Sequence, residues 1–450
     1  MPSLALHVRP DLSLAAILLY AFFAFALGLL FTPWFVTFLR GNKLGKQLRV
    51  ETVDGREASI FRKYHEKKFG TPTMGGLLIW GAIVVTVLFS RFLAYAGVVQ
   101  NSLLQRGQVY LPLFMLLSLG ILGAIDDYLN VVGANERQWQ KKLQPIRVFF
   151  LVMSIVIFLG GAYVLATGRA LSVFNGATSM PLIVFLLYVL SIAYLGSATA
   201  VLDDWVKHRC RKPNKKGGLA VIPKITSLLV ISLIGALWFY FKLGYNSVYV
   251  PFMGPVTVGW WYIPLAMFII VGTSNAVNVT DGLDGLAGGL LVIAFGAFGV
   301  LAYLNGLAVL AAFCAIAAGA IAAFLWHNVP PALFYMGDTG ALSLGGVLGV
   351  IALMTDQVLV LPLIGGIFVI EMLSVIIQLT SKRLRGGKKI FKAAPIHHHF
   401  EALEWGESKV TMRLWIIGAF LAFLGIAIGF YASRERIGVA MPADQTVNAL

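Results

Sequence analysis

Long apolar segments alternate with short polar loops along nearly the whole chain. Most of these segments have about 20 residues, the length of helix that crosses a hydrocarbon core roughly 30 Å thick. Backbone polar groups in lipid need partners within their own segment, so each segment is predicted to be a helix. The predicted spans lie near residues 13–39, 74–97, 110–125, 148–167, 181–202, 225–244, 261–278, 286–304, 307–326, 341–354, 357–379 and 412–432. The pattern therefore predicts an all-α polytopic membrane protein with about twelve transmembrane helices.

The composition agrees with a membrane protein and excludes an ordinary soluble domain. Of the 450 residues, 59% are hydrophobic and 12% are charged, and the mean hydropathy is +0.83. A net charge of +15 would suggest nucleic acid as the partner of a soluble protein. Here the basic residues lie in loops beside apolar segments, which favours anionic lipid or an anionic substrate and no nucleic-acid partner. Two cysteines, Cys210 and Cys314, are too few for a disulfide framework or a metal cluster.

The loop at 40–73 is rich in Lys and Arg, which places it on the cytoplasmic side by the positive-inside rule. Both chain termini are then expected on the outer side, with residues 433–450 as an outer tail. Counting onward puts five further loops on the inner face, namely 126–147, 203–224, 279–285, 327–340 and 380–411. The polar motifs all lie in or next to these inner loops. We therefore expect one membrane domain over residues 1–450, with its active site on the cytoplasmic face.

Carboxylates mark several of these loops. Asp126 and Asp127 end an apolar segment, where an ionised side chain costs free energy unless it meets water, a cation or another partner. Asp281 and Asp284 lie in a turn with two Asp-Gly steps, and Asp338 stands just before a predicted span. The simpler alternatives are helix ends at the aqueous interface, a turn chosen for its turn formers, and ordinary helix capping. Acids in this number favour a divalent cation, and oxygen ligands with phosphate select Mg²⁺ rather than zinc.

Other polar residues extend the pattern. Asn275 and Asn278 share one helical face, and Lys68 precedes a glycine-rich helix start that could cradle phosphate. Residues 397–399 are three adjacent histidines, which cannot all converge on one zinc ion but suit phosphate binding or proton transfer. Glu371 lies inside a predicted span and is either structural or groove-lining. Together these residues predict phosphoryl transfer at the membrane surface, with the metal and Lys neutralising a diphosphate.

The chain also contains a possible internal repeat. Asp126-Asp127 and Asp203-Asp204 each end an apolar segment, and each pair is followed by a basic loop and a proline, Pro145 or Pro223. The two units are offset by 77 residues at the acids. Residues 136–214 are therefore interpreted as an insertion or a duplicated helix-loop-helix unit, although acids at helix ends and prolines in loops also occur by chance.

Five motifs together resemble the signature set of the bacterial phospho-N-acetylmuramoyl-pentapeptide transferases, within the polyprenyl-phosphate sugar-phosphate transferase superfamily. They are GTPTMGG at 70–76, GAIDDY at 123–128, NAVNVTDGLDG at 275–285, MGD at 336–338 and APIHHH at 394–399. Each motif is weak alone, but their joint presence in the family's order is specific. The resemblance implies transfer of phospho-MurNAc-pentapeptide from its UDP-linked form to undecaprenyl phosphate, giving lipid I and UMP with Mg²⁺ in peptidoglycan synthesis. It also implies the bacterial inner membrane as location and leaves a homodimer open as the oligomeric state.

The resemblance further implies roles for individual residues. Asp126, Asp127, His397 and His398 correspond to the family's catalytic residues, and Asp338 to its Mg²⁺ ligand. The residues that correspond to the substrate-binding set are Lys68, Asn278, Asp281, Asp284, Asn328 and Tyr335. The motifs are compatible both with deprotonation of the lipid phosphate by Asp127 and with a covalent step.

Two departures from the family pattern concern the acid pair. The family has about ten spans, and the excess here lies at 136–214. The family also has Lys three residues after the acid pair, where this chain has Asn130, whereas Asp203-Asp204 is followed by Lys207 at the expected spacing. We favour Asp126 and Asp127 as the catalytic pair, with Lys207 or Lys224 supplying the missing charge. Competing hypotheses are a UDP-GlcNAc:polyprenyl-phosphate GlcNAc-1-phosphate transferase and a membrane transporter.

Overall fold

The computed structural model describes residues 12–45, 70–132 apart from 98, 100, 101 and 106, and 221–440. Within these ranges, nine helices are long and apolar enough to cross a membrane. The prediction of a mainly helical membrane protein is therefore confirmed. The spans predicted near 148–167 and 181–202, and with them nearly all of the proposed insertion, lie outside the described residues. The total of about twelve spans stays a prediction.

The described helices follow the apolar segments of the sequence closely. They are α1 (Leu14–Gly41), α3 (Gly76–Tyr95), α4 (Tyr110–Val132), α7 (Val221–Leu237), α8 (Tyr262–Thr280), α9 (Leu286–Leu304), α10 (Ala308–Asn328), α11 (Gly337–Met354), α12 (Leu361–Ile364), α13 (Gly366–Leu384), α14 (Ile396–Glu401) and α15 (Glu407–Ala440). A π-helical turn at Trp238–Lys242 prolongs α7. Helix α15 continues into the segment that was predicted to be an outer tail.

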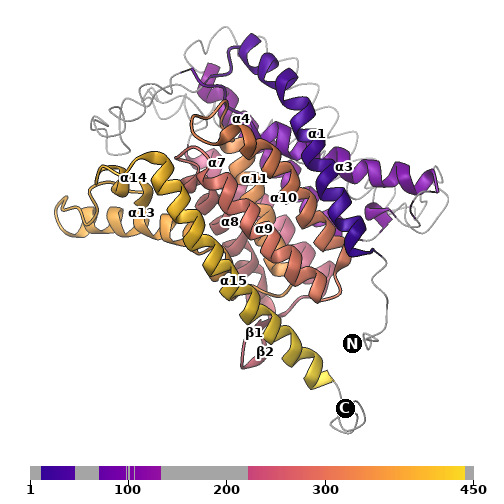
Figure 1. The fold of residues 1–450 in the computed structure, drawn as a ribbon. Helices are drawn as coiled ribbons and strands as arrows, with labels where there is room; N and C mark the ends of the chain where they lie inside the picture. The colour runs from indigo at the N-terminus through magenta and orange to yellow at the C-terminus, as the bar shows by residue number, and fades with distance from the viewer. Residues whose placement is uncertain are drawn as a thin grey trace.

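A small β-hairpin joins α7 to α8. Strands β1 (Ser247–Val250) and β2 (Gly254–Thr257) pair antiparallel, with Ser247 opposite Thr257. The all-α prediction missed it because each strand has only four residues, too short for a periodic signal. The hairpin lies at the end of the bundle where α8 begins (Figure 1). The functional residues described below lie at the opposite end of α8.

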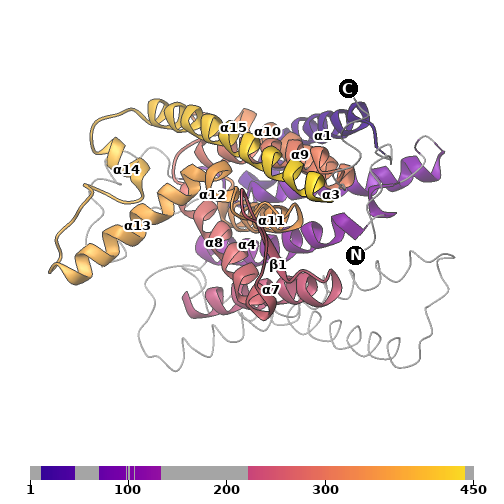
Figure 2. The same ribbon diagram turned by 90° about the horizontal axis from the view of Figure 1, so that it is seen from below.

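Helix α11 is the centre of the bundle. It packs most extensively against α4 and α8, and it also contacts α3 and α9. All of its residues from Thr339 to Leu353 are buried. Helix α10 packs between α1 and α9, and α15 lies along α9, so the long helices surround α11 (Figure 2). A polar group at the start of α11 is consequently enclosed by other helices.

Glycines allow two helices to reach the first turn of α11. A Cβ atom at Gly123 of α4 would overlap the backbone of Asp338, and one at Gly76 of α3 would overlap the backbone of Gly340. Only the absence of a side chain permits such close backbone approach. Gly123 therefore fixes where the last turns of α4, including Asp126 and Asp127, meet α11.

The single span predicted near 357–379 is wrong. The helix is interrupted at Gly365, which separates the short α12 from α13. Helix α13 contains Glu371 near its middle and two cations in its last turn, and it is not among the nine candidate spans. With α14, it extends from one side of the bundle in both views (Figures 1 and 2). Its hydropathy suggested a span because its outward face is apolar while its polar face is buried.

The close approach at Gly123 predicts the effect of adding one methyl group there. Gly123→Ala should destabilise the protein by about 1–3 kcal/mol, because α4 and α11 would have to separate. Gly81→Ala is a matched control, since a Cβ at that helical glycine meets nothing within 4 Å. The measurement is the thermal unfolding midpoint of both variants in detergent. Equal midpoints would contradict a tight α4–α11 contact.

Candidate functional site

The polar motifs gather at one end of the bundle, around the first turn of α11. The segment before α3 lies beside the segment before α11: the Tyr335 amide donates to the Pro72 carbonyl at 2.8 Å, and the Gly75 amide donates to the Tyr335 carbonyl at 2.7 Å. The end of α4, the start of α7 and the end of α8 reach the same place. The structure thus brings together motifs that are far apart in sequence. Lys68, Asp203, Asp204 and Lys207 lie outside the described residues.

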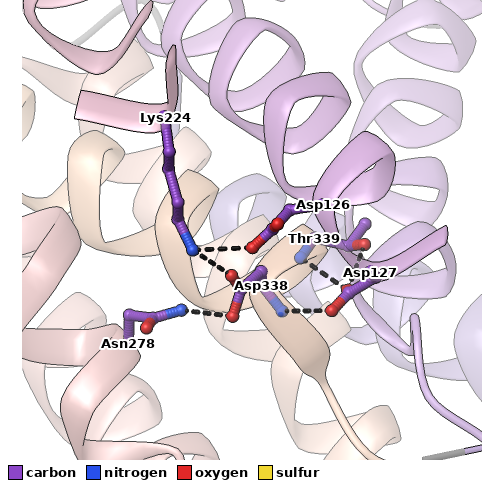
Figure 3. A network of polar contacts seen from close by, with 6 residues as sticks. All are labelled: Asp126, Asp127, Lys224, Asn278, Asp338 and Thr339. Carbon is purple, nitrogen blue, oxygen red and sulfur yellow. Dashed lines mark hydrogen bonds and ion pairs between the residues drawn. The ribbon is translucent and has the colours of Figure 1, made fainter. Parts of the chain in front are cut away.

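Asp127 caps α11 from another helix. Its Oδ1 accepts a hydrogen bond from the Asp338 amide at 3.1 Å, and its Oδ2 accepts from the Thr339 amide at 3.0 Å and the Thr339 hydroxyl at 2.7 Å (Figure 3). The first amides of a helix lack partners within it, and a carboxylate there is also favoured by the helix dipole. Both oxygens of this buried carboxylate are therefore occupied by α11.

Asp126 takes part in a different set of contacts. Lys224, in the first turn of α7, lies between Asp126 and Asp338: its Nζ is 2.8 Å from Asp126 Oδ2 and also bonds Asp338 Oδ2 (Figure 3). The other oxygen of Asp338, Oδ1, accepts from the Asn278 amide nitrogen at 2.7 Å. Two carboxylates from α4 and α11 therefore converge on one cation.

This arrangement fits a divalent metal ion by the chemistry of its donors. Asp126 and Asp338 offer carboxylate oxygens to a position next to a positive charge, and hard cations such as Mg²⁺ prefer oxygen ligands. Among the described residues, no group of three or more His, Cys, Asp or Glu side chains is arranged to hold a metal. Mg²⁺ commonly needs only one or two carboxylates, because water and substrate phosphates complete its shell.

The residues expected to bind substrate fall into two groups. Asp284 and Asn328 are buried and join loops: Asp284 Oδ2 accepts from the Ala332 amide at 3.0 Å, and Asn328 bonds both Gly285 and Phe334. Their geometry is that of a scaffold. Asn278, Asp281 and Tyr335 are partly exposed at the same end of the bundle. These three remain predicted substrate contacts.

Tyr335 is held as a neutral donor at this end. Burial, followed by the nearby Asp284 carboxylate, raises the pKa of the Tyr335 hydroxyl above its usual range. The hydroxyl therefore keeps its proton at any physiological pH. It can pack as an aromatic face or donate a hydrogen bond, but it does not act as a base.

The three adjacent histidines have three different partners. His397 Nδ1 lies 3.0 Å from Glu371 Oε2, and His398 Nδ1 lies 2.6 Å from Glu401 Oε2. His399 Nδ1 accepts from the Lys392 amide at 3.1 Å. The rings of His397 and His398 pack edge to face, with their centroids 4.2 Å apart, but their Nδ1 atoms face different carboxylates. His397 is fully buried, whereas the side chain of His398 is 18% exposed. The two histidines predicted to be catalytic are thus not equivalent.

Sequence reasoning missed two residues that organise the site. Thr339 supplies two of the bonds to Asp127, and Glu407 Oε1 accepts from the Asp284 amide at 2.7 Å. Thr339 follows Asp338 directly, so its place beside the acid was a usable signal. Glu407 lies 123 residues from Asp284, and nothing local indicated the contact. Lys224, one of two lysines considered as a source of charge, lies beside Asp126.

Known proteins are similar to this chain over nearly its whole length. The model of the glycosyl transferase family 4 matches residues 186–356. A phospho-N-acetylmuramoyl-pentapeptide-transferase of Chloroflexus aggregans is 36% identical over 441 residues, covering 96% of this chain and 94% of that protein. One from Chloroflexus aurantiacus is 35% identical over 439 residues, covering 95% and 93%. One from Halalkalibacterium halodurans is 34% identical over 410 residues, covering 91% and 96%. At this identity and coverage, the chain belongs to the phospho-N-acetylmuramoyl-pentapeptide transferase family.

Proposed function

We propose that this chain transfers phospho-MurNAc-pentapeptide from UDP-MurNAc-pentapeptide to undecaprenyl phosphate, giving lipid I and UMP in peptidoglycan synthesis. The observation that carries the proposal is the convergence of Asp126, Asp338 and Lys224 at one end of a bundle of membrane helices. A site at a helix end can meet a water-soluble nucleotide and a lipid phosphate at once. The curated relatives, which are named for this transferase activity, support the same reaction.

The chemistry of phosphoryl transfer consists largely of positioning and charge neutralisation. Mg²⁺, when bound by Asp338 and Asp126, would neutralise charge on the diphosphate. Lys224 contributes a fixed positive charge between the same two carboxylates. Asp127 accepts hydrogen bonds from the first amides of α11, and in this way it orients α4 and α11 relative to each other. His398 has a partly exposed side chain next to the fully buried His397, which suits substrate contact.

The orientation in the membrane belongs to the same proposal. We place the site at the cytoplasmic face of a bacterial inner membrane, with both termini outside. The basic loops of the sequence support this orientation, because the described residues that flank the loop at 40–73 lie beside the segment that leads into α11. The acids, amides and histidines lie at that end rather than at the middle of several helices, which favours an enzyme over a transporter.

The reaction can be tested directly. Detergent-purified protein with UDP-MurNAc-pentapeptide, undecaprenyl phosphate and Mg²⁺ should release UMP and form a lipid-linked product. The matched reaction with UDP-GlcNAc as donor should release no UMP above background. UMP from UDP-GlcNAc alone would move the assignment to the GlcNAc-1-phosphate transferases.

A paired substitution distinguishes the two acid pairs. Asp127→Asn should lower turnover about 10²-fold or more, the scale expected when catalytic groups are misplaced by about 1 Å, because an amide cannot accept all three hydrogen bonds that α11 donates to the carboxylate. Asp204→Asn should leave a measurable rate. The experiment is informative because the matched family model begins at residue 186, so that it includes Asp204 but not Asp127. The reverse outcome would assign catalysis to the second pair.

Removal of the Lys224 charge should expose the cation site to metal. Lys224→Gln leaves Asp126 and Asp338 facing each other, at a cost of about 1–3 kcal/mol because the ammonium is a quarter exposed. Added Mg²⁺ should raise the thermal unfolding midpoint of this variant more than that of the unmodified protein. Lys242→Gln, at the far end of the same helical segment, is the control and should respond like the unmodified protein. No difference in the Mg²⁺ response would exclude this position as the metal site.

A further inference from the structure

Helix α13 buries its polar face and exposes its apolar one. Glu371, Ser374, Gln378 and Ser381 are buried, and their spacing places them on one side of the helix. The opposite side exposes leucines and isoleucines, for example Ile376, which is 50% exposed. An outward apolar face suits lipid, but a buried polar stripe needs partners inside the protein.

Two residues of this stripe fasten the chain that returns after α13. The Ser381 hydroxyl donates to the Lys388 carbonyl at 3.0 Å. The Gln378 side chain accepts from the Ile390 and Phe391 amides at 3.0 and 3.1 Å, and donates to the Phe391 carbonyl at 2.8 Å. These bonds lead the segment after α13 back along the helix toward α14. The buried polar stripe of α13 therefore holds residues 388–391 against the helix by hydrogen bonds.

Glu371, the residue of the same stripe nearest the start of α13, contacts the histidine run. Its Oε2 is 3.0 Å from His397 Nδ1, and both side chains are completely buried. On the other side of the ring lies Gly282, in the loop between α8 and α9. A Cβ atom at Gly282 would lie 2.8 Å from Cε1 of His397 and still closer to Nε2. The imidazole is thus enclosed between a carboxylate of α13 and a backbone that only glycine allows.

The polar atoms of this contact are incompletely used. His397 Nε2 and Glu371 Oε1 have no hydrogen-bond partner among the described residues. Simple packing would be served better by apolar side chains, since unpaired buried polar atoms cost free energy. A carboxylate on Nδ1, however, fixes the orientation and the tautomer of an imidazole. The contact therefore serves to place the ring, and with it the α14 helix.

We propose that Glu371 is a positioning residue that, through His397 and Gly282, holds α14 against the α8–α9 loop and so sets the affinity for the nucleotide substrate. The inference rests on the proposed function for its kinetic part. His398 follows His397 directly, and Asp281 precedes Gly282, so one contact fixes a predicted catalytic residue and a predicted substrate-binding residue relative to each other. We call the contact of Glu371, His397 and Gly282 the latch. The fully buried His397 ring acts within this latch, and His398 meets the substrate.

The kinetic test compares two substitutions of Glu371. Glu371→Leu should raise KM for UDP-MurNAc-pentapeptide about tenfold, the scale seen when an outer hydrogen-bond partner of a binding group is lost, with kcat changed less than about threefold. Glu371→Gln keeps an oxygen acceptor for His397 Nδ1 and should stay within about twofold of the unmodified protein. Ser374→Ala is the matched control, because this buried hydroxyl of the same stripe bonds the Glu371 carbonyl of its own helix. An unchanged KM for Glu371→Leu, or a Gln variant as impaired as the Leu variant, would overturn the proposal.

A second measurement needs no substrate. Hydrogen–deuterium exchange of residues 396–403 and 281–285 should rise in Glu371→Leu but not in Glu371→Gln or Ser374→Ala. If the unmodified protein released no UMP, the proposed function would be wrong. The exchange data would still test whether Glu371 holds α14 against the α8–α9 loop. If Glu371→Leu does not fold, Gly282→Ala displaces the ring from the opposite side and should give the same rise in exchange and KM. Unchanged exchange in Gly282→Ala would then refute the latch.

Discussion

The first turn of α11 is enclosed by neighbouring helices at the site end of the bundle, and the Asp127 carboxylate of α4 accepts hydrogen bonds from its Asp338 and Thr339 amides. An uncapped helix end buried at that depth would cost several kilocalories per mole, as would an unpaired carboxylate. Each group removes the penalty of the other. The contact requires α4 to approach α11 at Gly123, and that approach also brings the adjacent Asp126 to Asp338. The geometry of the whole site depends on this one cap.

Around the cap, charge is balanced across several helices. Asp126, Asp127 and Asp338 come from two helices, Lys224 from a third and Asn278 from a fourth. Among the residues that the structure describes, the cluster has three carboxylates and one lysine, a ratio that favours a further cation. It also lies at one end of the helices, where the proposed reaction would bring a lipid phosphate and a soluble nucleotide together. An excess of acid would destabilise a closed core, and it fits the metal-dependent phosphoryl transfer that we propose.

A second set of contacts attaches the histidine run to this end of the bundle. Helix α13 turns its polar stripe inward, and the stripe binds the returning chain through Ser381, Gln378 and Glu371 in turn. The final contact, between Glu371 and His397, presses the ring onto Gly282 of the α8–α9 loop. Loops that carry predicted substrate contacts are thus held by buried polar side chains of a helix whose other side exposes apolar residues.

The positions of most helices and the kinds of chemistry present were predictable from the order of residues alone. Span length and hydropathy are local properties, so α1, α3, α4 and α7–α11 were predictable from apolar segments, and the acids, amides and histidines were recognisable as a site. The sequence also predicted that these motifs share one end of the molecule, because each follows or precedes a span in the right order. Local properties failed where a helix is polar inward and apolar outward, as in α13, since hydropathy does not report which face is buried. Other roles came from the way the helices pack. Asp127 caps α11 while Asp126 faces Lys224, Asp284 and Asn328 join loops, and His397 is held by Glu371. Those roles depend on which backbones come within hydrogen-bond distance, and that is set by helix packing across separations of up to 212 residues, as between Asp127 and Thr339.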